Sequence, residues 1–337
     1  MTTALALFSG GLDSTLACRV VMEQGIKVVA VKFVSPFFGA ELLAAPEAYR
    51  QKVRHQYGID VVLREVTQPY LRMLAAPAHG YGKNFNPCVD CKILLMREAL
   101  DMLPEFGASF LVSGEVLGQR PMSQRRDTLR VIERDSGCAD LLLRPLSALN
   151  LPPTRPEREG LVDRQRLHAF KGRNRTPQIE LAARFGIEDY QSPGGGCVLT
   201  DPNQAKRIQW LYREVGAQGR TPAAEDIRLL LAGRVFCLPG GAWAVLGRNQ
   251  AGNEQLQKRR GPGDWQLTLR DHPGPLAILR HLTGEDDLPA AAGLVLRYAA
   301  PKTRAAGPAV VTAEGPEQSR EITATPIADE VLATWRR

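Results

Sequence analysis

The residues that decide the fold of this chain are Ser9-Gly10-Gly11-Leu12-Asp13-Ser14. They follow the apolar run 4–8 and lead into a helical pattern over residues 14–25, so we expect a strand, a glycine turn and a helix. Two adjacent glycines let the backbone turn tightly, and the first turn of a helix offers unpaired N–H groups to an anion. Ser14 has the side chain of a helix cap. The stretch therefore predicts a phosphate-binding loop.

Strands and helices alternate regularly after this loop. Apolar, β-rich runs are followed by helical stretches, with strands expected at 4–8, 28–34, 61–66 and 109–113 and helices at 14–25, 46–58 and 90–103. This alternation indicates an α/β fold with a parallel sheet that is covered on both faces. Ligands of such sheets collect beyond the carboxyl ends of the strands. We therefore expect the segment that begins at Phe33 and the pair Gly114-Glu115 to form walls of a nucleotide pocket.

Length and composition indicate an ordinary globular protein. The 337 residues are 44% hydrophobic, which is enough for two domains, and we expect them at 1–201 and 234–337 with a helical connector at 202–233. No stretch has the length of a membrane span and no export signal is evident, so the expected location is the cytoplasm. Six cysteines in a chain of this length do not make a secreted disulfide scaffold. They point to metal or sulfur chemistry.

The net charge of +7 is unevenly distributed along the chain. The excess lies in two basic blocks, residues 115–184 and 203–275. Such blocks suit a polyanion such as RNA, because phosphate contacts supply much of its non-specific affinity. A solubilising surface would explain the same charge equally well.

Three cysteines form the second group of interest. Cys88 and Cys91 are three residues apart at a predicted helix start, where both sulfurs can face one point and the helix dipole is expected to lower their pKa. Cys197 follows the three glycines 194–196, on a loop that can approach closely. Three thiolates suit a [4Fe–4S] cluster with one open position for sulfide. A redox pair, half of a zinc site and purely structural cysteines are the alternatives.

The loop resembles the pyrophosphate loop, SGGxDS, of ATP pyrophosphatases. That resemblance implies that Ser9–Ser14 binds the phosphates of ATP with Mg²⁺, that Asp13 helps to hold the metal or a phosphate, and that a substrate is adenylated with release of pyrophosphate. Over residues 3–202 the chain is similar to tRNA thiouridine synthases. Segments 113–119 and 143–146 are similar to motifs of tRNA 4-thiouridine synthases, whereas Asn86-Pro87 and Cys197 are similar to tRNA 2-thiouridylases.

The sequence departs from these families at two points. The first position of the CxxC pair is typically an aspartate in 2-thiouridylases but is Cys88 here, which favours a cluster held by three cysteines over a persulfide mechanism. Synthases of 4-thiouridine usually carry an RNA-binding region ahead of the loop, which this sequence does not show. Recognition of tRNA would then need another module, to which the arginines between 120 and 134 contribute only in part.

The resemblance implies an ATP-dependent sulfurtransferase that makes 4-thiouridine or 2-thiouridine in tRNA. Its cofactors would be ATP, Mg²⁺ and a [4Fe–4S] cluster, and its partners tRNA and a sulfur donor, either a cysteine desulfurase or free sulfide. The residues implied are Asp13, Cys88, Cys91 and Cys197 for catalysis, the three cysteines for the metal, and Ser9–Ser14, Phe33, Gly114 and Gln119 for the nucleotide. Adenylation followed by attack of a nitrogen nucleophile is an alternative. So is a non-catalytic RNA-binding factor that senses ATP.

The last third of the chain predicts a smaller α+β domain. Apolar runs at 235–238 and 243–246 flank Pro239-Gly240-Gly241, which indicates a β-hairpin. Residues 235–300, with the stretches 247–254, 263–265 and 271–275, resemble the RNA-binding domain of NFACT proteins. The resemblance implies RNA contacts by Arg248, Asn253 and residues 258–260. Trp265 is expected to be either a stacking platform for a base or part of the core.

Overall fold

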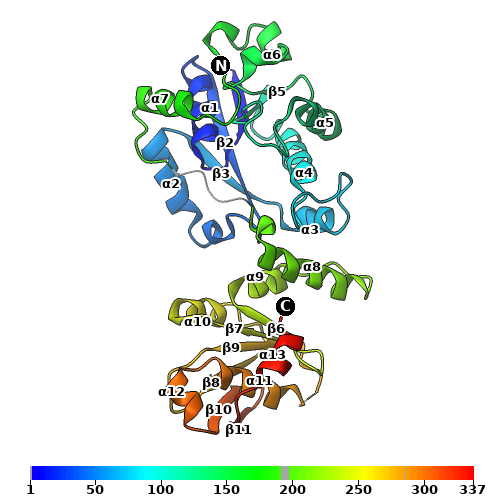
Figure 1. The fold of residues 1–337 in the computed structure, drawn as a ribbon. Helices are drawn as coiled ribbons and strands as arrows, with labels where there is room; N and C mark the ends of the chain where they lie inside the picture. Colours follow the sequence, from blue (N-terminus) through cyan, green and yellow to red (C-terminus); the bar gives the residue numbers. More distant parts are fainter. Residues whose placement is uncertain (1, 191–196, 285) are drawn as a thin grey trace. The chain divides into compact units, whose positions relative to one another are not determined.

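A computed structural model describes residues 2–190, 197–284 and 286–337 (Figure 1). The chain divides into two compact units, Met1–Pro202 and Asn203–Arg337, each of which is described by itself. Among the described residues, no helix combines the length and the apolar character needed to cross a membrane.

The first unit is built on a five-stranded parallel sheet in the order β3-β2-β1-β4-β5. Its strands are β1 Thr3–Leu7, β2 Lys27–Val34, β3 Asp60–Glu65, β4 Phe110–Ser113 and β5 Leu142–Leu143. Its α-helices are α1 Leu12–Met22, α2 Pro46–Tyr57, α3 Thr67–Ala75, α4 Cys88–Asp101, α5 Arg126–Ser136, α6 Arg155–Arg158 and α7 Thr176–Arg184. Short 3₁₀ helices are η1 Ala40–Ala44, η2 Ala148–Asn150, η3 Arg164–Arg166 and η4 Val198–Thr200.

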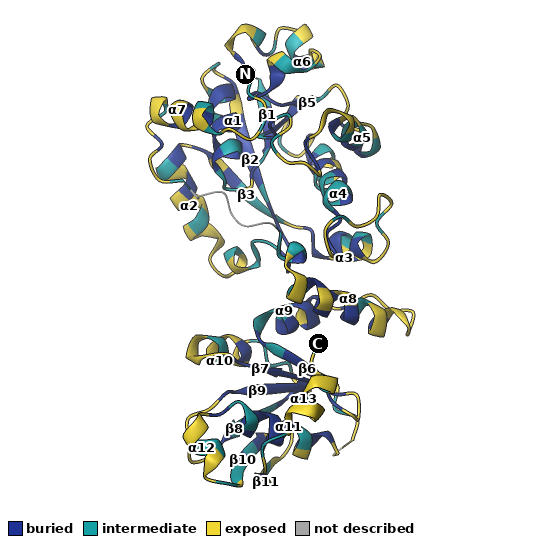
Figure 2. Cartoon of the chain, viewed as in Figure 1, coloured by how far each residue is buried: buried dark blue, intermediate teal, exposed yellow. Residues whose placement is uncertain are grey.

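Side chains of the central strand alternate between two cores. Ala4 and Ala6 of β1 pack with α1, α2 and α7 on one face, while Leu5 packs with α4 and α5 on the other. Figure 2 shows the strands buried and the outer surfaces of the helices exposed. The predicted α/β fold, with helices on both faces of a parallel sheet, is therefore confirmed.

The glycine loop lies at the point where the strand order reverses, between β1 and β4. β1 pairs in parallel with β2 on one side and with β4 on the other, so the carboxyl ends of β1 and β4 lie side by side. The loop after β1 holds Ser9–Ser14, and the loop after β4 begins with Gly114. Open parallel sheets bind ligands at this position.

The second unit contains a six-stranded antiparallel sheet in the order β11-β10-β8-β9-β7-β6. Its strands are β6 Arg234–Cys237, β7 Trp243–Leu246, β8 Trp265–Leu269, β9 Ala277–Arg280, β10 Ala309–Glu314 and β11 Ser319–Ala324. Its helices are α8 Pro202–Gly216, α9 Ala224–Ala232, α10 Gln250–Gln257, α11 Asp287–Arg297, α12 Pro301–Ala305 and α13 Asp329–Trp335. The apolar helix α11 packs on this sheet and supplies much of its core.

The predicted hairpin is present as the antiparallel pair β6 and β7. Its turn is held by Asp287, whose carboxylate accepts hydrogen bonds from the backbone N–H groups of Gly240 (2.7 Å) and Ala242 (2.9 Å). A buried arginine fixes β9, because Arg280 donates to Asp264 at 2.7 Å and to Asp226 at 3.0 Å. Together these elements confirm the expected α+β unit.

Candidate functional site

The loop Ser9–Ser14 is braced by its own serine side chains. Gly10 has φ +85°, a left-handed conformation that favours glycine. The Ser9 hydroxyl accepts a hydrogen bond from the Gly11 N–H (3.2 Å), and the Ser14 hydroxyl donates to the Gly11 carbonyl (2.8 Å) and accepts from the Ser9 N–H (3.2 Å). The expectation that Ser14 caps α1 is wrong: the N-cap is Gly11, and Ser14 lies inside the first turn. Its hydroxyl ties the loop together instead.

The first turn of α1 has backbone donors to offer. The bond from the Thr15 N–H to the Gly11 carbonyl (3.1 Å) opens the helical ladder. The amides before it, on Leu12, Asp13 and Ser14, come too early in the helix for an intrahelical partner. They are the groups that bind phosphate at helix N-termini, where the dipole also favours negative charge.

Asp13 is held from one side only. Its Oδ2 accepts a hydrogen bond from Nε2 of Gln119 at 2.8 Å, and the Arg175 guanidinium lies 3.7 Å from the same oxygen. Its Oδ1 is buried and has no hydrogen-bond partner among the residues that the structure describes. A carboxylate oxygen in this position is suited to a hard cation such as Mg²⁺.

A lysine that we did not predict stands beside the loop. Lys32 of β2 donates from Nζ to the Ser9 carbonyl. Burial lowers the pKa of Lys32, and the nearby charge of Glu41 partly opposes that shift. The signal in the sequence was a cation inside the apolar run 28–34, a position that normally carries an apolar side chain.

Gly114 allows the loop after β4 to touch the start of α1. A Cβ atom at this position would lie 2.6 Å from the carbonyl carbon and oxygen of Asp13 and 2.6 Å from Cα of Ser14. These are backbone atoms, which cannot move aside as a flexible side chain could. The close approach of two loops therefore depends on glycine at this position.

We expect Gly114→Ala to push Asp13 away from Gln119 and to destabilise the first unit by ~1–3 kcal/mol, as overpacking of a tight contact does. The temperature of thermal unfolding and the affinity for ATP should both fall. The matched control is Gly216→Ala at the end of α8, where no atom lies within 4 Å of the added Cβ. If Gly114→Ala melted and bound ATP like the unaltered protein, the close approach would not matter.

Buried charges connect the loop after β4, helix α4 and the segment after β5. Glu115, which is 2% exposed, lies 3.0 Å from Nε of Arg144 and 3.4 Å from Nζ of Lys92. Burial alone would raise the pKa of the Glu115 carboxyl, but the charges of Lys92 and Arg144 bring it below its usual value. Glu115 therefore stays ionised and links the loop after β4 to helix α4 and to the segment after β5.

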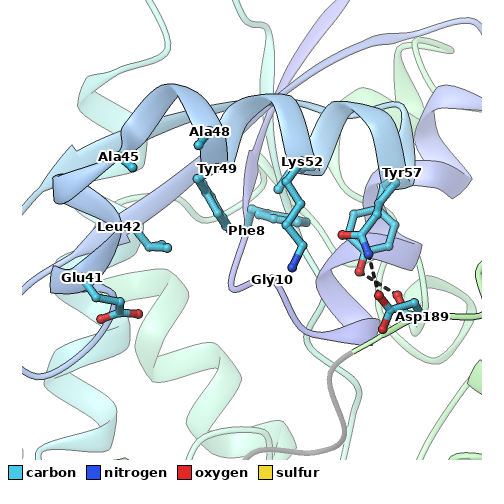
Figure 3. A pocket seen from close by; sticks show the side chains of 12 residues that line it. Phe8, Gly10, Glu41, Leu42, Ala45, Ala48, Tyr49, Lys52, Tyr57 and Asp189 are labelled. Carbon is cyan, nitrogen blue, oxygen red and sulfur yellow. Dashed lines mark hydrogen bonds between the residues drawn. The ribbon is translucent and has the colours of Figure 1, made fainter. Parts of the chain in front are cut away.

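A cavity of about 380 Å³ opens between α2 and the glycine loop. Figure 3 shows Tyr49 and Lys52 projecting from α2 into this space near Gly10, with Asp189 at one end. Asp189 is fixed there by Gln56, which donates to its carboxylate at 2.7 Å, and by the Tyr57 hydroxyl, which donates to its carbonyl at 2.9 Å. The volume is typical of a site for a small ligand.

The remaining residues that were predicted to bind the nucleotide lie in two different places. Gly114 and Gln119 both contact Asp13 or its neighbour, as described above. Phe33 is 5% exposed and packs in the core formed with α4, on the face of the sheet opposite α1. The cavity wall contains Phe8 and Leu42 in its place.

Tyr70 of α3 lies near the predicted cysteines. Burial raises the pKa of Tyr70 well above its usual value, and interactions with Cys91, Cys197 and Cys88 raise it further, including a hydrogen bond between Tyr70 and Cys91. Cys88 and Cys91 lie in the first turn of α4, as predicted. Cys197 directly precedes η4, and the glycines 194–196 before it lie outside the described residues.

The thiol chemistry differs from the prediction. Burial raises the pKa of Cys91 to about 12 and also raises that of Cys197, so the expected lowering by the helix dipole is wrong for Cys91. The nearby charge of Lys92 opposes the shift at Cys91 without cancelling it. All three thiols are free. Within the described ranges, no three His, Cys, Asp or Glu side chains are arranged to hold a metal ion.

Contacts of the chain before α4 hold the cysteine region in place. The Asn86 side-chain amide donates to Sγ of Cys88 at 2.9 Å. Asn84 donates from Nδ2 to the Thr200 carbonyl at 2.8 Å, which joins η4 to this segment and thereby brings Cys197 towards α4. His79 lies between Asp90 of α4 (3.1 Å) and Asp135 of α5 (3.0 Å).

The second unit uses the predicted RNA contact Asn253 for its own structure, and of the two roles expected for Trp265 it shows the core role. Asn253 accepts from the Leu276 N–H at 3.0 Å and donates to the Gly274 carbonyl at 3.2 Å. Trp265 is 8% exposed and packs in the core of the sheet, where Gly315 lies against its ring. Arg248 and Lys258 remain on the surface.

Two family models match this chain. Residues 1–151 match the family described as Thiamine biosynthesis protein (ThiI), and residues 233–336 match the NFACT protein RNA binding domain. The first match covers the glycine loop, Gln119 and the CxxC pair, and the second covers the antiparallel sheet.

Individual relatives agree with the first match. A protein of Thermococcus kodakarensis named "Probable tRNA sulfurtransferase" is 29% identical over 147 residues, which are 43% of this chain and 37% of that protein. A protein of the same name from Methanothermobacter thermautotrophicus is 35% identical over 117 residues, which are 34% of this chain and 29% of that protein. The chain thus spans about a third of the length of these relatives.

Among solved structures, a 4-thiouridine synthetase in complex with RNA and bound ATP aligns with 68% of this chain and 54% of its own, at 19% identity and a TM-score of 0.39. Residues 1–151 are therefore similar to the ThiI family, of the pyrophosphate-loop type, and residues 233–336 are similar to the NFACT RNA-binding domain.

Proposed function

We propose that this chain is an ATP-dependent tRNA sulfurtransferase that replaces a carbonyl oxygen of a uridine with sulfur and makes 4-thiouridine. The observation that carries the proposal is Asp13, which stands at the start of α1 with one buried carboxylate oxygen that meets no partner among the described residues. The same unit holds the three cysteines around Tyr70. Activation by ATP and delivery of sulfur would therefore share one domain.

The glycine loop would bind the triphosphate. Backbone N–H groups at the start of α1 would contact phosphate oxygens, and Lys32 would add positive charge beside Ser9. Mg²⁺ would bind Oδ1 of Asp13, which fits because that oxygen is buried and needs a partner. The cavity beside Gly10, lined by Leu42, Ala45 and Tyr49, would take the adenosine.

The reaction would proceed in two steps. The uridine carbonyl oxygen attacks the α phosphorus, an O–P bond forms, and pyrophosphate leaves with the electrons of the broken P–O bond. Backbone dipoles at the start of α1 would stabilise the charge that develops on the leaving group, and Mg²⁺, when bound, would add positive charge there. A sulfur nucleophile then attacks the activated carbon, a C–S bond forms, and AMP departs with the original uridine oxygen.

The three cysteines would bring the sulfur. We propose Cys88, Cys91 and Cys197 as holders of a [4Fe–4S] cluster, because three free thiols in one unit can ligate three irons and leave the fourth open. When bound, such a cluster would supply a site for sulfide. Among the described residues these sulfurs are not grouped as a metal site, so binding of a cluster would have to bring them together. Sulfide itself would come from a cysteine desulfurase or from solution.

The second unit would bind the tRNA. Its match to an RNA-binding domain and its exposed cations Arg248 and Lys258 support this role. Since Asn253 and Trp265 serve the fold, the cations are the better candidates for contact.

The test of the proposal is nucleoside mass spectrometry of bulk tRNA from cells that lack the gene. We expect loss of 4-thiouridine that the unaltered gene restores and the Asp13→Ala gene does not. Loss of 2-thiouridine instead would support the same reaction, with sulfur replacing O2 of the uridine in place of O4. Unchanged thionucleosides would contradict the proposal and favour nitrogen transfer or a purely RNA-binding role.

A further inference from the structure

A buried glutamine of α7 reaches Asp13 through a second glutamine. Gln178 is fully buried, at 0% exposure. Its Nε2 donates to Oε1 of Gln119 at 3.1 Å, and Nε2 of Gln119 donates to Oδ2 of Asp13 at 2.8 Å. Three residues from three distant parts of the chain thus form one line of hydrogen bonds that ends at the glycine loop.

Chemistry fixes the direction of this line. An ionised carboxylate can only accept, so the amide nitrogen of Gln119 must face Asp13. The oxygen of Gln119 then faces Gln178, which must present its own nitrogen in turn. The oxygen of Gln178 is left over, and it has no hydrogen-bond partner in the described part of the chain. Gln178 therefore holds the oxygen of Gln119, and this contact keeps the amide nitrogen of Gln119 on Asp13.

The line determines which oxygen of Asp13 is open. Gln119 and Arg175 both approach Oδ2, whereas Oδ1 is buried and meets no donor among the described residues. A buried acceptor without a hydrogen-bond partner destabilises the fold. A site that keeps such an acceptor is therefore suited to a ligand that binds to it. Carboxylate oxygen is the ligand that Mg²⁺ prefers.

We propose that Gln178 is a positioning residue that acts through Gln119 to hold Asp13 with Oδ1 open to the Mg²⁺ of bound MgATP. The inference rests on the proposed use of ATP, and it adds a residue far from the loop on which metal binding depends. Gln178 touches neither the metal nor the nucleotide in this scheme.

The experiment is a double-mutant cycle measured by calorimetric titration of the full chain with ATP, once with Mg²⁺ and once with EDTA. We expect Gln119→Leu, which removes one hydrogen bond to a charged group, to weaken MgATP binding about tenfold. Gln178→Leu should weaken it by about the same factor, because it removes the bond that holds Gln119 on Asp13. Binding of metal-free ATP should change less than about twofold, because the missing bond acts on the metal ligand. The double variant should be no weaker than either single one, since both act through the same contact.

Two further variants sharpen the test. Gln178→Glu has a carboxylate that can only accept, so it should turn the Gln119 oxygen towards Asp13 and weaken MgATP binding more than Gln178→Leu does. Gln24→Leu is the matched control. Like Gln119, Gln24 makes two side-chain hydrogen bonds, both to the backbone of Asp163, and it lies just beyond the far end of α1. This variant should bind MgATP normally. Gln119 is only partly buried, so Gln119→Leu and Gln119→Glu keep the test open if Gln178→Leu does not fold.

Additive losses in the double variant would overturn the proposal, as would equal losses with and without Mg²⁺. Either result together with normal thiouridine formation would leave the proposed function standing. An unaltered protein that bound no MgATP at all would overturn both.

Discussion

Asp13→Asn is expected to lower tRNA-dependent release of pyrophosphate about a thousandfold, an effect of ~4 kcal/mol on the barrier. The substitution removes the negative charge that would hold Mg²⁺ at the unpartnered Oδ1. Its side-chain oxygen can still accept from Gln119, so the loop and the sheet should keep their structure. The rate is measured as pyrophosphate released per enzyme, with thermal unfolding in parallel.

The matched control is Asp127→Asn. Asp127 lies in the exposed first turn of α5 and pairs with Arg125 at 3.0 Å, away from the glycine loop. Exposed pairs of this kind contribute little, so both rate and stability should stay within about twofold of the unaltered protein. Asp13→Asn with normal pyrophosphate release would remove Asp13 from the reaction and with it the metal site.

Cys91→Ser is expected to separate the two steps. Thiouridine formation should fall at least about a thousandfold, because serine cannot hold or transfer sulfur as cysteine does. Pyrophosphate release in a single turnover should stay within about threefold, because the substitution leaves the glycine loop and its hydrogen bonds intact. Thiouridine is measured by mass spectrometry of the tRNA product and pyrophosphate by a coupled assay on the same sample.

Cys237→Ser serves as the matched control, because Cys237 is a partly exposed thiol of β6 in the second unit. It should leave both products unchanged. Cys91→Ser that still formed thiouridine would show that sulfur arrives by another route. Cys91→Ser that lost both products would show that the cysteine region is needed for adenylation or for the fold.

The sequence predicted those parts of the fold that local pattern controls. The apolar runs marked β1 to β4, and the glycines marked the loop, because strands and turns depend on neighbouring residues. It did not reveal β5, since Leu142–Leu143 is too short to show a period. It also misplaced the role of Ser14, because whether a serine caps a helix or lies within it depends on where the loop before it ends.

The site could be predicted only in part, for the same reason. Asp13, Gly114 and Gln119 were found because they belong to recognisable motifs. Arg175 and Gln178 were not, because Arg175 meets Asp13 and Gln178 meets Gln119 across long stretches of the chain, and such contacts leave no spacing signal. The pKa of Cys91 was misjudged because burial, which only the structure shows, outweighs the helix dipole.

An oxygen tracer would show whether the uridine oxygen is adenylated before sulfur replaces it. A tRNA labelled with ¹⁸O at the uridine carbonyl is incubated with the full chain, MgATP and sulfide, and AMP and nucleosides are analysed by mass spectrometry. We expect one ¹⁸O in the AMP for every 4-thiouridine formed, because AMP departs with the uridine oxygen. Thiouridine accompanied by unlabelled AMP, or by ADP and phosphate, would contradict it.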